Sequence, residues 1–395
     1  MKQHLWIGLL SVATLVTGCK SKQAPPPVIE FHPVAVNNFA KTWTVDLGLA
    51  KRAKPTNVYV FDNLIIVYAD DNTAHVVDRQ SGQLKYVHPL PLDAGTLHAP
   101  SVIGDRIIYP ATSTIKVYSV KTGSLMNELN YHFAIRSSGT GNGSNFYISA
   151  DYPNGGRIVA LDLNRKDSLP RWEIMTVASV RGAPILYGGI VYAAADDGKV
   201  FAVSEERGSV WSLDDSYEGA FRTGGQIVAD IRVDETAVYV ASIDTKLVAL
   251  NRSNGKIIWQ YIAGIPLEHG PMTTNDSVYI YVKGQGLTAI NKLQGDYLRK
   301  PRWSKPNAEK FLADDDKFTY VLLASGQVAA LDKANGDQKF ISTRNDLTCF
   351  GVNTKDGLVY ATDAKGNLLQ VKPVVKQGVV GEVVMVVRPL EIASR

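Results

Sequence analysis

The sequence predicts an all-β protein, an eight-bladed β-propeller built from four-stranded antiparallel blades. The first observation is that residues 183–213 contain four short apolar runs separated by turns at 187–189, 196–198 and 206–208. Such turns, rich in Gly and Asp, suit hairpins between antiparallel strands. A unit of this size cannot cover both of its faces, so it needs copies of itself on either side.

The second observation is that the unit recurs along the chain. Each copy contains a small or apolar pair, then a polar residue, usually followed four positions later by Gly. The polar residues are Asp78, Ser119, Asp162, Ser204, Asn251, Asn291, Asp332 and Gln370. Their steps are 41, 43, 42, 47, 40, 41 and 38 residues, a spacing typical of propeller blades. The third and eighth units lack the Gly.

A third observation is an aromatic residue after the last turn of most units. The residues at this position are Tyr86, Trp172, Trp211, Trp259, Trp303 and Phe340. Because the position repeats from unit to unit, we expect these rings to pack between blades rather than to stack on a cofactor.

Closure of the ring is predicted from the two ends of the repeat region. Residues 41–47 contain Trp43 and resemble a fourth strand with no strands before it, whereas the last unit has three strands and then Pro373. Pairing them would remove two open sheet edges; the alternative is a free N-terminal strand. Residues 379–387 are also strand-like, and could pair with a blade edge or compete for the closing position.

The N-terminal residues predict export and lipidation. Residues 1–18 resemble a signal peptide, since Lys2 precedes an apolar stretch, residues 5–16, that is too short to span a membrane. Gly18-Cys19 resembles a lipobox, with Cys19 as the lipidated residue; the alternative is an ordinary signal peptide with a chance Cys. Lys20 favours the outer membrane. We expect a lipidated flexible tether over 19–40, the propeller over 41–372 and a tail over 373–395.

The composition argues against several other functions. The net charge of +4 comes from scattered residues, so nucleic-acid binding is not indicated. Two Cys and seven isolated His predict neither a disulfide framework nor a metal site. The Gly-rich residues 138–143 lack the Lys of a phosphate loop, and the acidic residues at 70–71 and 314–316 read as turns rather than calcium ligands. We expect no catalytic residues and no cofactor.

The repeated pattern resembles the quinoprotein-type propeller repeat, which occurs in quinone-dependent alcohol dehydrogenases and in non-enzymatic relatives. The dehydrogenases carry an adjacent Cys pair, which this chain lacks. With the lipobox, the tether and eight units, the chain is similar to the lipoprotein subunits of the outer-membrane β-barrel assembly machinery. That resemblance implies a non-enzymatic scaffold on the periplasmic face of the outer membrane. Its partners would be the BamA-like barrel subunit and unfolded outer-membrane proteins.

Two short stretches carry the implied partner contacts. Residues 179–184 resemble the family's Leu-Arg-Gly loop, and residues 229–234 resemble its Asp-Val-Asp loop one unit later. The resemblance implies that Val180, Arg181 and Asp230 contact the barrel subunit. Arg232 stands where the family has an acidic residue, which alters the charge of this part of the site. The alternative for Arg181 is a structural pair with a neighbouring loop.

Two other functions remain open from the sequence. One is a quinone-dependent dehydrogenase relative, which would need a bound quinone and calcium. The other is a surface lipoprotein that binds a polymer through the central funnel of the ring.

Overall fold

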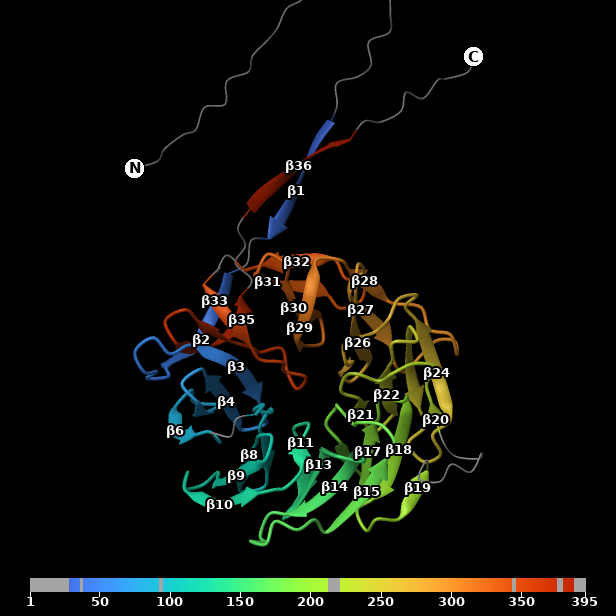
Figure 1. Ribbon diagram of the computed structural model, residues 1–395. Coiled ribbons are helices and arrows are strands. Elements are labelled where there is room, and N and C mark those ends of the chain that lie inside the picture. Colours follow the sequence, from blue (N-terminus) through green and yellow to red (C-terminus); the bar gives the residue numbers. More distant parts are fainter. Residues whose placement is uncertain are drawn as a thin grey trace, which may run out of the picture. The chain divides into compact units, whose positions relative to one another are not determined.

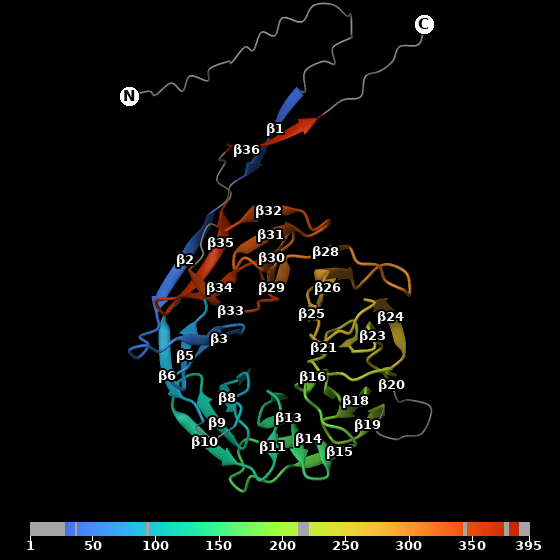
Figure 2. The same cartoon turned by 45° about the horizontal axis from the view of Figure 1, so that its top comes forward.

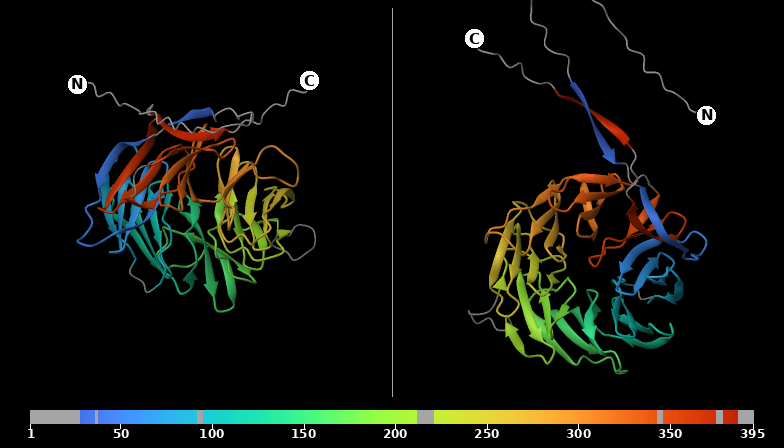
Figure 3. Two further views of the ribbon diagram at one scale, coloured as in Figure 1. Left: turned by 90° about the horizontal axis from the view of Figure 1, so that it is seen from above. Right: turned by 180° about the vertical axis from the view of Figure 1, so that it is seen from behind.

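The propeller is a ring of eight antiparallel sheets around a central channel (Figure 1, Figure 2). The computed structural model describes residues 28–35, 38–91, 95–211, 221–342, 346–374 and 379–386. Residues 35–378 form one compact unit that contains every blade. Figure 3 shows the same ring from behind. The prediction of an eight-bladed β-propeller with four-stranded blades is confirmed.

Each of the first four blades runs from an inner strand beside the channel to an outer strand at the rim. Blade 1 has β3 (Pro55–Val60), β4 (Leu64–Ala69), β5 (Thr73–Asp78) and β6 (Leu84–Pro89). Blade 2 has β7 (Ser101–Ile103), β8 (Arg106–Pro110), β9 (Thr114–Ser119) and β10 (Leu125–Asn130). Blade 3 has β11 (Ala134–Ile135), β13 (Asn145–Tyr152), β14 (Gly155–Asp162) and β15 (Trp172–Thr176), with β12 (Thr140–Asn142) beside β13. Blade 4 has β16 (Ile185–Tyr187), β17 (Ile190–Ala194), β18 (Lys199–Ser204) and β19 (Ser209–Trp211), with β20 (Phe221–Arg222) beside β18.

The other four blades repeat this order. Blade 5 has β21 (Arg232–Val233), β22 (Val238–Ala241), β23 (Lys246–Leu250) and β24 (Ile257–Ile262). Blade 6 has β25 (Met272–Thr273), β26 (Ser277–Val282), β27 (Gly286–Asn291) and β28 (Trp303–Lys305). Blade 7 has β29 (Ala308–Asp314), β30 (Phe318–Leu323), β31 (Val328–Asp332) and β32 (Gln338–Ile341). Blade 8 has β33 (Leu347–Phe350), β34 (Val359–Asp363), β35 (Asn367–Val374) and β2 (Asn38–Asp46).

The middle strands of the blades are apolar over nearly their whole length. Every residue of β4, β22 and β34 is buried. This is expected for a strand covered on both faces, because side chains pointing either way meet a neighbouring blade. The hydrophobic core therefore consists of clusters that each join two adjacent blades, such as the cluster of Tyr147 in blade 3 with Val191 and Phe201 in blade 4.

The ring closes by pairing its first and last strands. β2 is antiparallel to β35, with Trp43 opposite Gln370 and Asp46 opposite Asn367. The predicted closing strand with Trp43 is therefore confirmed, and the free N-terminal strand is wrong.

The aromatic residue of one blade packs on the Gly turn of the next. A Cβ added to Gly82 would lie 2.6 Å from Trp43, and one added to Gly336 would lie 2.7 Å from Trp303. The indole of Trp303 also donates to the carbonyl oxygen of Lys333 at 3.0 Å, and that of Trp211 donates to the carbonyl oxygen of Arg252 at 2.8 Å. The prediction that these aromatic rings join the blades is confirmed.

A second set of contacts between blades was not predicted. A buried Tyr occupies the second strand of every blade, at Tyr68, Tyr109, Tyr147, Tyr192, Tyr239, Tyr279, Tyr320 and Tyr360. Ion pairs lie beside several of them. Lys292 of blade 6 lies 2.7 Å from Asp234 of blade 5, and Arg79 of blade 1 lies 2.7 Å from Asp356 of blade 8. These charges compensate each other at blade junctions, where either alone would be costly to bury.

The chain ends form a separate unit that contains a two-stranded sheet. β1 (Val28–Ala35) pairs with β36 (Val379–Val386). The strand-like tail therefore takes neither of its expected partners, because it pairs with a strand from the range expected to be a tether. The predicted signal peptide and Cys19 lie outside the described residues. Among the described residues, no helix is long and apolar enough to cross a membrane.

The junction between Trp43 and Gly82 gives a stability prediction. Gly82 has φ of +72° and is packed against the Trp43 ring, whereas Gly104 has φ of +55° and open space around it. Gly104→Ala adds only backbone strain, about 1 kcal/mol. Gly82→Ala adds a steric clash as well, and we expect it to cost about 1–3 kcal/mol more. Urea unfolding followed by Trp fluorescence measures both; equal losses would contradict the packing argument.

His88 gives a prediction about pH. Burial lowers the pKa of His88 from 6.5 to about 4, and its ring stacks on Tyr118 with centroids 4.1 Å apart. The unfolded chain therefore takes up a proton at a higher pH than the folded one. The free energy of unfolding should fall as the pH drops from 6.5 to 4, by about 2 kcal/mol at pH 5.

The matched variant is His88→Phe, which keeps a stacked ring and removes the titrating group. Urea unfolding at pH 7 and pH 5 should show a smaller loss in His88→Phe than in the wild-type protein. The same loss in both proteins would assign the acid sensitivity to other groups.

Candidate functional site

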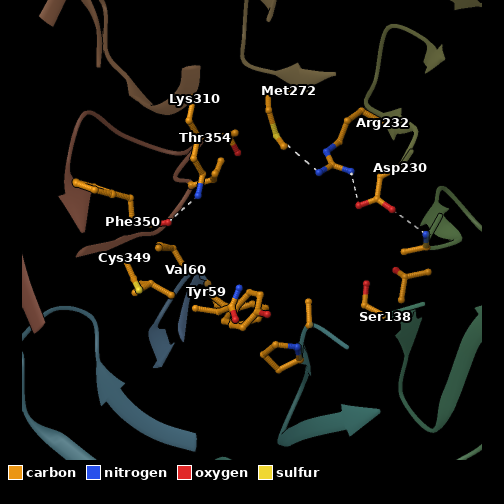
Figure 4. Close-up of a pocket in the computed structure, with 18 of the residues that line it drawn as sticks. Tyr59, Val60, Ser138, Asp230, Arg232, Met272, Lys310, Cys349, Phe350 and Thr354 are labelled. Atoms are coloured by element: carbon orange, nitrogen blue, oxygen red, sulfur yellow. Dashed lines mark hydrogen bonds and ion pairs between the residues drawn. The ribbon is translucent and has the colours of Figure 1, made fainter. Parts of the chain in front are cut away.

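The inner ends of the blades surround a cavity of about 710 Å³ in the channel (Figure 4). Each blade, or the connection leading into it, contributes lining residues, among them Tyr59, Pro100, Ser138, Pro184, Asp230, Met272, Lys310 and Phe350. Because a closed ring fixes all of these positions, the loops at the rim of the cavity are held on a rigid frame.

Asp230 and Arg232 lie on the wall of this cavity, at the entrance to blade 5 (Figure 4). The Asp230 carboxylate accepts a hydrogen bond from the backbone N–H of Ala183 at 3.0 Å, and its second oxygen lies 3.7 Å from Arg232. Arg232 also donates to the carbonyl oxygen of Ile231 at 2.9 Å. Asp230 thus helps to hold the connection into blade 4, and the Arg232 guanidinium partly neutralises the negative charge of Asp230.

Arg181 lies on that connection and is exposed. Its Nε donates to Asp196 Oδ2 at 2.6 Å, while 52% of the side chain remains accessible. Asp196 belongs to the hairpin between β17 and β18, and its N–H donates to the carbonyl oxygen of Ser179 at 2.8 Å. The structural pair considered for Arg181 therefore exists, yet the guanidinium group contributes only its Nε to this hydrogen bond.

Val180 does not fit the role that the resemblance implies. Its relative exposure is 0%, and it packs with Tyr147, Val191 and Phe201 between blades 3 and 4. A side chain with no accessible surface cannot contact a partner while the blades are packed. The structure therefore contradicts Val180 as a contact residue; we assign it to the core.

The structure brings the two predicted loops together. A Cβ added to Gly182 would lie 3.1 Å from the Cα of Asp230, so the loop with Arg181 lies against the loop with Asp230. Asp196, which orients Arg181, was not among the predicted site residues. Its position in a recurring hairpin turn was visible, but only the fold shows which loop that turn faces.

The channel does not fit the calcium and quinone pair of the dehydrogenases. Within the described ranges, no group of three or more His, Cys, Asp and Glu side chains could hold a metal ion. Asp230 is the only carboxylate among the described residues lining the cavity, and Ala183 and Arg232 already engage it.

The acidic stretch at 314–316 is also occupied by internal contacts. Lys333 lies 3.0 Å from Asp314, and Tyr320 donates to Asp315 at 2.7 Å. Burial raises the pKa of Asp314, even though the Lys333 ammonium favours its charged form. Tyr279 of blade 6 also donates to Asp314 at 3.2 Å, which joins blades 6 and 7. Asp314 is the last residue of β29 and is buried, so its interpretation as a turn residue is wrong, whereas Asp315 and Asp316 follow the strand.

Fold and repeat together define a quinoprotein-type β-propeller. The model of the family described as "Outer membrane protein assembly factor BamB" matches residues 111–262 and 222–340. The two matches run from residue 111 to residue 340, which is more than half of the 395-residue chain. The chain therefore belongs to the BamB family.

Individual relatives are distant. The chain is 24% identical over 223 residues to BamB of Nitrosomonas eutropha, covering 54% of this chain and 48% of the relative. It is 22% identical over 362 residues to BamB of Yersinia pestis, covering 85% and 79%. The quinoprotein alcohol dehydrogenase PedH of Pseudomonas putida is 25% identical over 176 residues, covering 39% and 29%. The matched regions thus span about half of the Nitrosomonas relative and less than a third of PedH.

A solved structure shares the fold. The crystal structure of BamB from Moraxella catarrhalis superposes with a TM-score of 0.61 at 16% identity, covering 85% of this chain and 99% of that one. At this identity the similarity supports the architecture alone.

Proposed function

We propose that this protein is a non-catalytic scaffold subunit of the outer-membrane β-barrel assembly machinery. In this role it binds the periplasmic domains of the barrel subunit and assists the insertion of outer-membrane proteins. The observation that carries the proposal is that a BamB-family propeller presents Arg181 on a loop packed against the Asp230 loop. Both loops belong to the stretches in which the resemblance places the partner contacts.

The geometry suits binding rather than catalysis. Asp196 holds Arg181 from one side, so its guanidinium group is oriented before a partner arrives. Fixing a side chain in advance reduces the entropy lost on binding. Asp230 acts mainly as a positioning residue, since one of its oxygens holds Ala183. Arg232 already donates to the carbonyl oxygen of Ile231, so it contributes less to partner binding than Arg181 does.

The attachment to the membrane is part of the same proposal. Residues 1–18 would be removed as a signal peptide, and Cys19 would carry acyl chains that anchor the protein at the periplasmic face of the outer membrane. The residues between Cys19 and β2 would link the anchor to the propeller, whose blade strands run from Asn38 to Val374 rather than over the expected range 41–372.

A dehydrogenase function is the second candidate, favoured by the similarity to PedH. The described channel lacks a suitable set of metal ligands, which counts against it. A quinone absorption band in protein purified from its own membranes would favour the enzyme, and co-purification of a β-barrel protein without that band would favour the scaffold.

The partner contact is tested by Arg181→Glu. Reversing the charge of an exposed, oriented Arg at an interface should weaken binding to the barrel subunit's periplasmic domains at least about tenfold. The measurement is a binding titration with the purified domains. The matched control is Arg165→Glu, because Arg165 is also exposed and paired with a carboxylate, Asp167, but lies at the opposite end of its blade. Equal affinity of both variants and the wild-type protein would contradict the proposed contact.

The anchor is tested by Cys19→Ala. Loss of the acyl chains should move the protein from the outer-membrane fraction to the soluble periplasmic fraction, because the chains supply the membrane affinity. Fractionation followed by immunoblotting measures the shift. Retention of the variant in the membrane fraction in cells lacking the barrel subunit would show that another element provides the anchor.

A further inference from the structure

An exposed apolar side chain lies on the same loop as Arg181. Val177 follows β15 and is 88% exposed, more than any other large apolar side chain among the described residues. Met175, two positions earlier on β15, is 63% exposed. Single exposed apolar residues are common on proteins, so the position of Val177 matters only because of how its loop is held.

The loop around Val177 is fixed on both sides. Thr176 Oγ1 donates to the carbonyl oxygen of Ala178 at 2.7 Å, which bends the chain around Val177. Ser179 Oγ donates to Asp151 Oδ1 at 2.7 Å, and Val180 is buried between blades 3 and 4. Val177 is therefore presented by a backbone anchored immediately before and after it. A partner that covers its side chain would lose little loop entropy.

Two oriented guanidinium groups accompany this apolar side chain. Arg181 is held through Nε by Asp196, and Arg136 is held through Nε by Asp151 at 3.0 Å. Asp151 also accepts from Ser179, so it ties Arg136 to the loop of Val177. Neither Arg donates from its Nη atoms to another described residue. Each can offer these paired N–H groups to a carboxylate in the geometry that Arg prefers.

We infer that Val177, Met175, Arg136 and Arg181 form one docking surface, the Val177 surface, for a protein domain with a shallow apolar pocket bordered by carboxylates. This inference rests on the proposed function and concerns the same partner. It differs from the family resemblance, which placed the aliphatic contact at Val180. Asp151 and Asp196 balance the charge of the two Arg, so the surface has little attraction for an anionic lipid bilayer and suits a domain with localised carboxylates.

The test is Val177→Asp in the full-length lipoprotein, titrated with the purified periplasmic domains of the barrel subunit. Placing a carboxylate in the apolar contact should weaken binding about tenfold or more. Val87→Asp is the matched control, since it makes the same change at a half-exposed position on β6 of blade 1 and should leave the affinity unchanged. Because Val177 is exposed, its variant should keep the wild-type melting temperature.

Val180→Ala completes the design, and it should lower the melting temperature without weakening binding. If Val177→Asp bound the periplasmic domains with unchanged affinity while Arg181→Glu bound them more weakly, this inference would be overturned. The proposed function would still stand. If Val180→Ala alone weakened binding to the periplasmic domains, the aliphatic contact would be assigned to Val180 again. That result would also overturn this inference. Absence of binding by the wild-type protein would overturn both the inference and the proposed function.

Discussion

Hydrogen bonds between β2 and β35 join residues 38–46 to residues 367–374 and turn a row of blades into a closed ring. Without them, blade 8 would lack its outer strand and leave a long sheet edge open to other chains. Closure also brings Trp43 onto Gly82 of blade 1, so the last junction uses the same aromatic–glycine packing as other junctions. Every loop at the channel depends on this closure, because each is positioned by the two blades that flank it.

The proposed site follows from that dependence. The connection into blade 4 contacts the hairpin of blade 4 through Asp196 and the connection into blade 5 through Asp230. Two other pieces of chain therefore orient this connection, one at Arg181 and one at Ala183. A binding surface built in this way needs no rearrangement when a partner arrives, which suits a scaffold whose role is to hold other proteins in position.

Much of the ring was predictable from the sequence, because a period near 42 residues and a recurring Gly turn report packing that repeats in every blade. Closure by the Trp43 strand was predictable for the same reason, since one unit lacked a fourth strand. The second-strand Tyr was visible in the sequence, but its role depends on which blade its ring faces. For the site, the sequence located the loops and the resemblance suggested residues within them. It could not show that Val180 points into the junction between blades while Val177 points out, since the Thr176 and Ser179 hydrogen bonds decide that orientation.

The closing strand also constrains how the protein can be made. β2 precedes every other blade strand in the chain, yet its partner β35 ends at residue 374. During synthesis, β2 must wait until nearly the whole chain is available before it can pair with β35. Seven blades can begin to pack in sequence, but the eighth is assembled from both ends of the propeller at the last moment. This contact between distant parts of the chain makes ring closure the step with the largest loop-closure entropy. We propose that this protein assists the assembly of other proteins. Its own folding requires that its first blade strand, β2, stays unpaired until its last blade strand, β35, is complete.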